Sequence, residues 1–179
     1  MKISLKTIKY NKMGISPVIA TVIIVAVTIT VAVAISYWMG GIAGLYTRFE
    51  KIEISYATVE YDSNNKYWVI ILKVKNTGSA DARIDDILLN GISIFNVKNN
   101  DGKYANYNTS SSNIPTIQPS NNPVSSVSIL VNSGGEIYIA IALPDSAKMG
   151  SSIASSGLSL EIKLHTAAGK DYPKIITLP

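Results

Sequence analysis

The chain has 179 residues, no cysteine, one histidine and a net charge of +4 at pH 7. The lack of cysteine excludes disulfides and thiolate metal sites, and a lone histidine does not supply the three or four ligands of a zinc site. Four lysines before residue 14 account for the whole net charge, so residues 15–179 carry no formal net charge. A nucleic-acid-binding protein spreads its basic residues over a folded face, so we expect no nucleic acid partner.

The first predicted element is a long apolar helix. No charged side chain lies between Gly14 and Thr47, a run of 33 residues counted from Ile15. A helix needs roughly 20 apolar residues to cross the hydrocarbon core of a bilayer, so this run is longer than a membrane requires. Positive residues before an apolar helix favour a cytoplasmic amino terminus. We therefore expect a transmembrane or filament-core helix over residues 15–50, with the lysines inside the cell.

Short apolar runs separated by turn residues occupy the rest of the chain. The first two runs flank the turn Asp62-Ser63-Asn64-Asn65 and predict a hairpin. In all there are eight such runs, at residues 52–61, 67–74, 84–89, 92–97, 124–131, 136–142, 158–164 and 174–178. This pattern predicts an α+β chain in which an all-β, Ig-like sandwich of about eight strands, residues 51–179, follows the helix. His165 is expected to be a half-exposed residue of a strand or its flank.

One polar segment, residues 99–122, is predicted to be a single long surface loop. It is rich in Asn and Ser and contains two prolines. It includes Asn108-Thr109-Ser110, which matches the acceptor pattern for N-glycosylation. Asn108 is therefore a candidate glycosylation site in an exported domain.

No motif in the sequence indicates catalysis. The serines do not form a Gly-x-Ser-x-Gly elbow, and no glycine-rich phosphate loop occurs. Asp81, Asp85 and Asp86 lack the oxygen-ligand spacing of a calcium loop and are expected to lie on a solvated surface. We therefore expect a protein that is not an enzyme and has no catalytic residue, metal or cofactor.

The junction between the lysines and the apolar run has a distinctive sequence. Lys12-Met13-Gly14 is followed directly by Ile15-Ser16-Pro17-Val18-Ile19-Ala20-Thr21. This stretch resembles the class III leader of archaeal type IV pilins, in which a membrane aspartyl peptidase cuts after a glycine. The resemblance covers residues 9–39 and implies a leader peptide, residues 1–14, that is cleaved between Gly14 and Ile15. Pro17 then becomes the third residue of the mature chain, where its missing N–H costs nothing.

The same resemblance implies a structural role. The chain would be inserted in the cell membrane as a precursor and then assembled into an extracellular adhesion filament. Its implied partners are further copies of itself, the prepilin peptidase, a pilus assembly ATPase and a membrane platform protein. Bacterial type IV pilins usually carry a glutamate five residues into the mature helix, where this chain has Ile19, which favours the archaeal branch. The residues implied in helix assembly are Ile15, Pro17, Val18, Ile19, Val22, Ile23, Val27 and Val31.

Three alternatives stay open at the level of sequence. Ala32-Val33-Ala34 matches the pattern for secretory signal cleavage, but the apolar run before it exceeds the usual length of about 7 to 15 residues. The small residues of the helix suit both close helix packing and an ordinary anchor. As an anchor, the helix would hold a membrane-bound extracellular β-sandwich that binds a ligand. The third alternative is an archaellin-type subunit of a motility filament.

Overall fold

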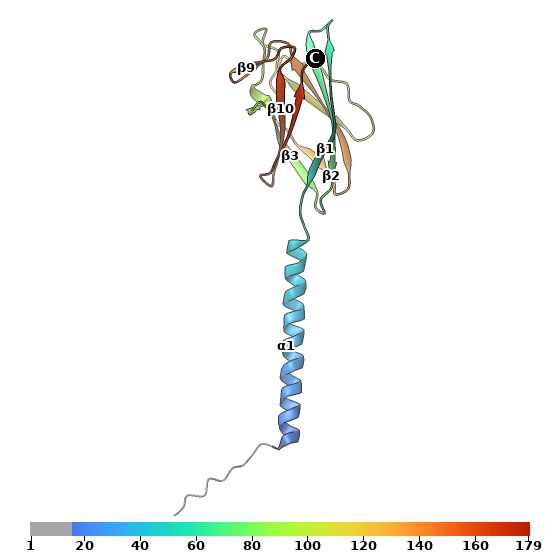
Figure 1. Cartoon of the computed structure of the whole chain (residues 1–179), viewed down its shortest axis with the longest axis vertical. Coiled ribbons are helices and arrows are strands. Elements are labelled where there is room, and N and C mark those ends of the chain that lie inside the picture. The colour runs from blue at the N-terminus through green and yellow to red at the C-terminus, as the bar shows by residue number, and fades with distance from the viewer. Residues whose placement is uncertain (1–15) are drawn as a thin grey trace, which may run out of the picture. The chain divides into compact units, whose positions relative to one another are not determined.

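The computed structural model describes residues 16–179. The expected leader, residues 1–14, and the cleavage site between Gly14 and Ile15 lie outside the described residues and stay predictions. The chain divides into two compact units, of which the first ends at Thr47 and the second is Arg48–Pro179. Figure 1 shows the helix of the first unit and the strands of the second.

The first unit contains helix α1, Pro17–Tyr46, which confirms the predicted apolar helix. Pro17 stands in the first turn, where no helical hydrogen bond needs its missing N–H. At the other end, the N–H of Thr47 donates to the Ala43 carbonyl at 3.2 Å. The helix ends before the expected limit at residue 50, because Phe49 accepts hydrogen bonds from the β-domain instead.

Within the described residues, four antiparallel strands form the first sheet of the β-domain, in the order β1-β2-β7-β5. The strands are β1 (Ile52–Asp62), β2 (Tyr67–Asn76), β5 (Asn106–Ser110) and β7 (Glu136–Pro144). Strands β1 and β2 form the predicted hairpin. In its turn, Asp62 Oδ1 accepts hydrogen bonds from the backbone N–H groups of Asn64 at 3.0 Å and Asn65 at 3.1 Å. Aspartate favours turns through this side-chain bond to the backbone.

The second sheet has the order β11-β10-β3-β4, and β6 also pairs with β3. Strands β4 and β6 pair with opposite ends of β3, while β10 pairs along its other edge. A separate ribbon consists of β8 (Lys148–Met149) and β9 (Ser152–Ile153). The strands of the second sheet are β3 (Ala82–Leu89), β4 (Ile92–Ser93), β6 (Ile129–Val131), β10 (Ser159–Thr166) and β11 (Asp171–Thr177).

The two sheets enclose one hydrophobic core in a sandwich-like arrangement (Figure 1). Strand β10 shows the expected alternation, because Leu160, Ile162 and Leu164 are fully buried and the residues between them are not. From the first sheet, Ile70 and Leu72 of β2 join the same core. Full burial of one such side chain stabilises the fold by roughly 1.5 to 3 kcal/mol. The predicted fold class is confirmed.

Four parts of the β-domain differ from the expected strands. Residues 99–122 are not one loop, because β5 lies within them and pairs with β7. Residues 92–97 contain only the two-residue β4, followed by a 3₁₀ turn, Ile94–Asn96. Only β6 of the expected run 124–131 is a strand, and β8 and β9 were not predicted, so the described residues contain eleven strands. Strand β5 has the polar sequence Asn-Tyr-Asn-Thr-Ser, and backbone pairing with β7 places it rather than an apolar pattern.

Candidate functional site

The exposed apolar surface of α1 is the main candidate for a functional surface. No charged side chain lies between Pro17 and Tyr46. Most of the large apolar side chains described on the helix are exposed, from 49% at Val31 to 85% at Tyr37. Over Pro17–Gly44, the helix is long and apolar enough to cross a membrane. A helix that is apolar on every side is stable in lipid or among other apolar helices, and not alone in water.

The structure describes all of the predicted assembly residues except Ile15, which lies outside the described residues. They do not gather on one narrow face, because successive residues of a helix are about 100° apart. All of them are exposed: Pro17, Val18, Ile19, Val22, Ile23, Val27 and Val31. The helix therefore offers several sides to neighbours at once.

The threonine and serine hydroxyl groups of α1 are hydrogen-bonded within the helix itself. Thr21 Oγ1 donates to the Val18 carbonyl at 2.8 Å, and Thr28 Oγ1 donates to the Ile24 carbonyl at 2.7 Å. Thr30 and Ser36 donate in the same way to the carbonyl four residues earlier. An unpaired polar group is costly in hydrocarbon, so these bonds suit the helix to an apolar environment.

Small residues leave room at two places on α1. A shallow groove of about 380 Å³ lies over Thr21, Val22, Val25, Ala26 and Ile29. Farther along, a Cβ added at Gly40, Gly41 or Gly44 would meet no atom of residues 16–179 within 4 Å, apart from its chain neighbours and the adjacent helix backbone. Packing inside this chain therefore does not require these small residues. Small residues at such positions let helices approach each other closely.

Comparisons with known proteins do not assign the chain to a family. No family model matches it, and no curated protein matches it. Among solved structures, it is similar to the archaellum periplasmic stator protein FlaG from Sulfolobus acidocaldarius. The sequence identity is 18% and the TM-score 0.40, over 72% of this chain and 100% of that chain. A TM-score this low establishes neither a shared fold nor a shared function.

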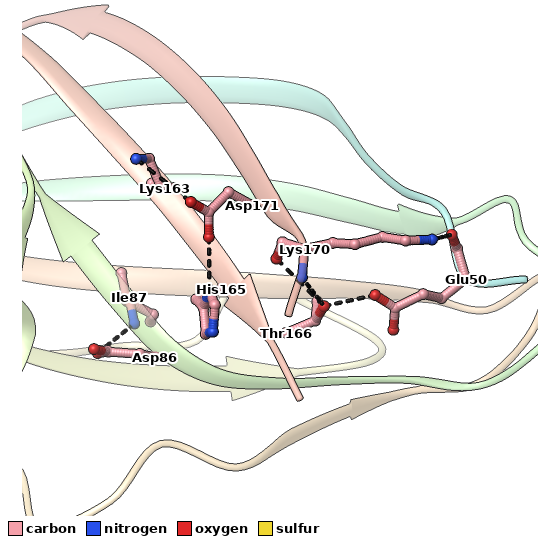
Figure 2. A network of polar contacts seen from close by, with 8 residues as sticks. All are labelled: Glu50, Asp86, Ile87, Lys163, His165, Thr166, Lys170 and Asp171. Atoms are coloured by element: carbon pink, nitrogen blue, oxygen red, sulfur yellow. Dashed lines mark hydrogen bonds and ion pairs between the residues drawn. The ribbon is translucent and has the colours of Figure 1, made fainter. Parts of the chain in front are cut away.

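In the β-domain, the segment directly before β1 is held by hydrogen bonds. The carbonyl of Phe49 accepts a bond from the Ser79 N–H at 2.9 Å. Figure 2 shows Glu50 Oε1 accepting a bond from Thr166 Oγ1 at 2.6 Å, and the Glu50 carbonyl accepting one from Lys170 Nζ at 3.2 Å. These bonds fix the place where the chain enters the β-domain. No local sequence pattern predicts these hydrogen bonds. The partners of Glu50, Thr166 and Lys170, are more than a hundred residues away from it in the sequence.

His165 lies on β10 with its side chain 39% exposed, which confirms the expected half-exposed position. Its Nδ1 lies 2.6 Å from Asp171 Oδ1 on β11, and Lys163 Nζ lies 3.6 Å from the other carboxylate oxygen (Figure 2). The hydrogen bond raises the pKa of His165 above its ordinary value and lowers that of Asp171. Within residues 16–179, no three His, Cys, Asp or Glu residues are placed to hold a metal ion.

The aspartates of β3 and its flank are hydrogen-bond acceptors of the fold. Asp86 Oδ1 accepts bonds from the Ile87 N–H at 2.7 Å, as Figure 2 shows, and from Ser93 Oγ at 2.8 Å. Asp81 Oδ1 accepts a bond from the Ser133 N–H at 2.8 Å. Asp81 and Asp85 are exposed, as expected for a solvated surface, whereas Asp86 is half-buried.

The candidate glycosylation site, Asn108, is exposed on β5, at the edge of the first sheet. Its Nδ2, the atom that would carry a sugar, donates to the Thr116 carbonyl at 3.0 Å. Its Oδ1 accepts a bond from the Thr109 N–H at 2.9 Å. Modification of the folded domain would have to break the bond to Thr116. Glycosylation of Asn108 stays a prediction.

Proposed function

We propose that this chain is the structural subunit of an archaeal adhesion-type type IV pilus that polymerises through α1. The observation that carries the proposal is the exposed apolar surface of α1, with its threonine and serine hydroxyl groups bonded internally. Such a helix needs lipid or other apolar helices around it. In this proposal lipid surrounds α1 in the precursor, and neighbouring copies of α1 surround it after the leader is cut between Gly14 and Ile15.

The length of α1 supports a role beyond anchoring. Its 30 residues span about 45 Å at about 1.5 Å per residue, whereas the hydrocarbon core of a bilayer is about 30 Å thick. An anchor of about 20 residues would suffice to hold the β-domain at a membrane. The groove over Thr21 and Ala26 and the glycines without close neighbours provide places for helix packing.

Assembly by this route needs machinery besides the subunit. Moving α1 from lipid into a helix bundle exchanges one apolar environment for another, so the hydrophobic effect alone gives little driving force. The proposed partners are therefore the prepilin peptidase, a cytoplasmic assembly ATPase and a membrane platform protein. The β-domain forms the outer part of the extracellular filament and supports adhesion, with no catalytic step, cofactor or nucleic acid.

Cysteine cross-linking tests this proposal cleanly, because the natural chain contains no cysteine. In a Val27→Cys variant, a short bis-maleimide should link copies of the chain in sheared surface filaments. The same variant dissolved as monomer in detergent is the control and should stay unlinked. If the protein is recovered only as a detergent-soluble monomer, and electron microscopy of sheared material shows no filaments, a membrane-anchored binding module replaces the pilus subunit.

A further inference from the structure

Two hollows adjoin at one end of the β-domain. The chain enters the β-domain at Glu50, which is hydrogen-bonded to Thr166, and β1 runs from there to Asp62. The hollows lie near the Asp62 end of β1, so they are remote from the point of entry. One hollow, of about 310 Å³, is lined by polar residues that include Lys66, Asp101 and Lys103. The other, of about 410 Å³, is lined by Tyr61, Trp68 and two serines. Asp145 lines both hollows and joins them.

An aromatic pair forms a wall of the second hollow. Tyr61 and Trp68 lie opposite each other on β1 and β2, with ring centroids 5.1 Å apart and planes at 46°. Trp68 is buried beneath the surface, whereas Tyr61 is 41% exposed. In the described part of the chain, the buried indole N–H of Trp68 has no hydrogen-bond acceptor. A buried donor left unpaired is unusual, and is expected where water or a ligand completes a site.

The polar residues of the hollows are fixed by two tight turns. Lys66 and Ser146 both have left-handed backbone conformations, with φ of 55° and 58°. The Asp145 N–H donates to the Lys66 carbonyl at 3.0 Å and ties the two turns together. Non-glycine residues in this conformation are strained and tend to occur at ligand-binding sites. Asp145 is thereby held between the polar and the aromatic hollow.

The charges lining the polar hollow balance. The lining contains two lysines, Lys66 and Lys103, and two aspartates, Asp101 and Asp145, so its formal charges cancel. Asparagines of the lining supply further hydrogen-bond donors and acceptors. A balanced set of this kind does not favour a strongly charged ligand, but it matches one that has many hydroxyl groups. The exposed ring of Tyr61 offers a flat apolar face beside these polar groups. A pyranose ring has this combination of an apolar C–H face and hydroxyls at its rim.

We propose that the two hollows form one groove that binds a neutral oligosaccharide of hexopyranose units. One sugar ring stacks on Tyr61, Asp145 accepts hydrogen bonds from sugar hydroxyls, and Lys66 and Lys103 donate to the next unit. The site lies wholly within the β-domain and does not require polymerisation. It therefore goes beyond the proposed pilus function and gives the β-domain a surface for attachment to polysaccharide.

Calorimetric titration of the full-length chain in detergent, with cellotetraose and maltotetraose as probes, tests the groove. At least one of them should bind, and Tyr61→Ala should weaken that binding at least tenfold. Tyr56→Ala is the matched control, because Tyr56 is also exposed on β1 but does not line either hollow, and it should leave binding unchanged. Asp145→Asn should weaken binding while circular dichroism shows an intact β-domain.

The proposal is overturned if neither tetrasaccharide binds, or if Tyr61→Ala binds as well as Tyr56→Ala. Binding of an unrelated extended peptide with equal affinity would overturn the assignment to sugars. The sugar-binding test and the test of filament assembly are independent of each other. Filaments without sugar binding would leave the pilus function intact, and sugar binding without filaments would leave the groove intact.

Discussion

Gly78 lies where two backbone segments of the β-domain approach each other closely. A Cβ added there would lie 2.4 Å from the Phe49 carbonyl oxygen and 2.6 Å from the Lys51 nitrogen. Both atoms belong to the fixed segment before β1, which cannot move away without losing its hydrogen bonds to Thr77 and Ser79. Gly78 lies in the sequence Asn-Thr-Gly-Ser, directly after β2. This sequence does not show that a distant segment lies on the glycine.

Gly78→Ala is expected to destabilise the β-domain by about 1 to 3 kcal/mol, because the added methyl group overlaps backbone atoms. Urea denaturation followed by near-ultraviolet circular dichroism measures this change. Gly44→Ala is the control, since a Cβ at that position would meet no atom within 4 Å. Equal denaturation midpoints for Gly78→Ala and wild type would contradict the close approach.

The pair His165 and Asp171 makes the stability of the β-domain depend on pH. The hydrogen bond between His165 and Asp171 raises the pKa of His165 above 6.5. Desolvation opposes this rise, and the negative charges of Asp85 and Asp86 add to it. The same bond lowers the pKa of Asp171 below 3.8. The histidine contribution is complete below pH 6.5 and is lost as pH rises through the raised pKa. The aspartate contribution is complete above pH 3.8 and is lost as pH falls through the lowered pKa.

We therefore expect Asp171→Asn to destabilise the protein most at about pH 5, and less once His165 is neutral. Denaturation of wild type and variant at a series of pH values measures the difference in unfolding free energy. Lys163→Gln should show no such step near neutral pH, because lysine stays charged over this range. A difference for Asp171→Asn that is constant from pH 5 to about pH 8 would show that the ion pair is not formed.

Among the elements, those with a strong apolar pattern could be predicted from the sequence. Helix α1 has an uncharged run of membrane length, and β10 has strict alternation. Strand β5 was missed because its position depends on hydrogen bonds to β7 and not on its polar side chains. The contact between His165 and Asp171 depends on the register of β10 and β11, which no local pattern encodes.

The groove on α1 separates filament assembly from membrane anchoring. Ala26→Leu keeps the helix apolar and so should leave the amount of protein in the membrane fraction unchanged. It fills the groove over Thr21, Val22 and Val25, so filament yield in sheared material should fall severalfold. Val27→Asp should reduce both quantities, since a charge at the centre of a membrane helix costs about 2.5 to 3.5 kcal/mol.

Fractionation with immunoblotting measures the membrane pool in these variants, and electron microscopy measures filament yield. Ala34→Leu, which makes the same substitution at an exposed position outside the groove, is the control and should assemble normally. Normal filaments from Ala26→Leu would mean that this face of α1 does not pack against other helices.

At the scale of the whole molecule, the described part of the first unit is a single helix, and the second unit has a hydrophobic core of its own. The β-domain buries its own apolar residues, whereas α1 leaves its apolar residues exposed. The sequence indicates this division because no charged residue lies between Lys12 and Arg48. The β-domain is stabilised by its own core, whereas α1 requires lipid or other protein molecules around it. The function of the chain therefore depends on what happens to the amino-terminal segment in the cell.

The mass of the chain recovered from sheared surface filaments tests this account most directly. Intact-mass and amino-terminal peptide analysis should find a chain that starts at Ile15, with α1 retained and residues 1–14 absent. A chain that still starts at Met1 would indicate a permanent anchor, and one that starts at Ile35 would indicate secretory cleavage with loss of most of α1. Either of these results would contradict assembly through the processed helix.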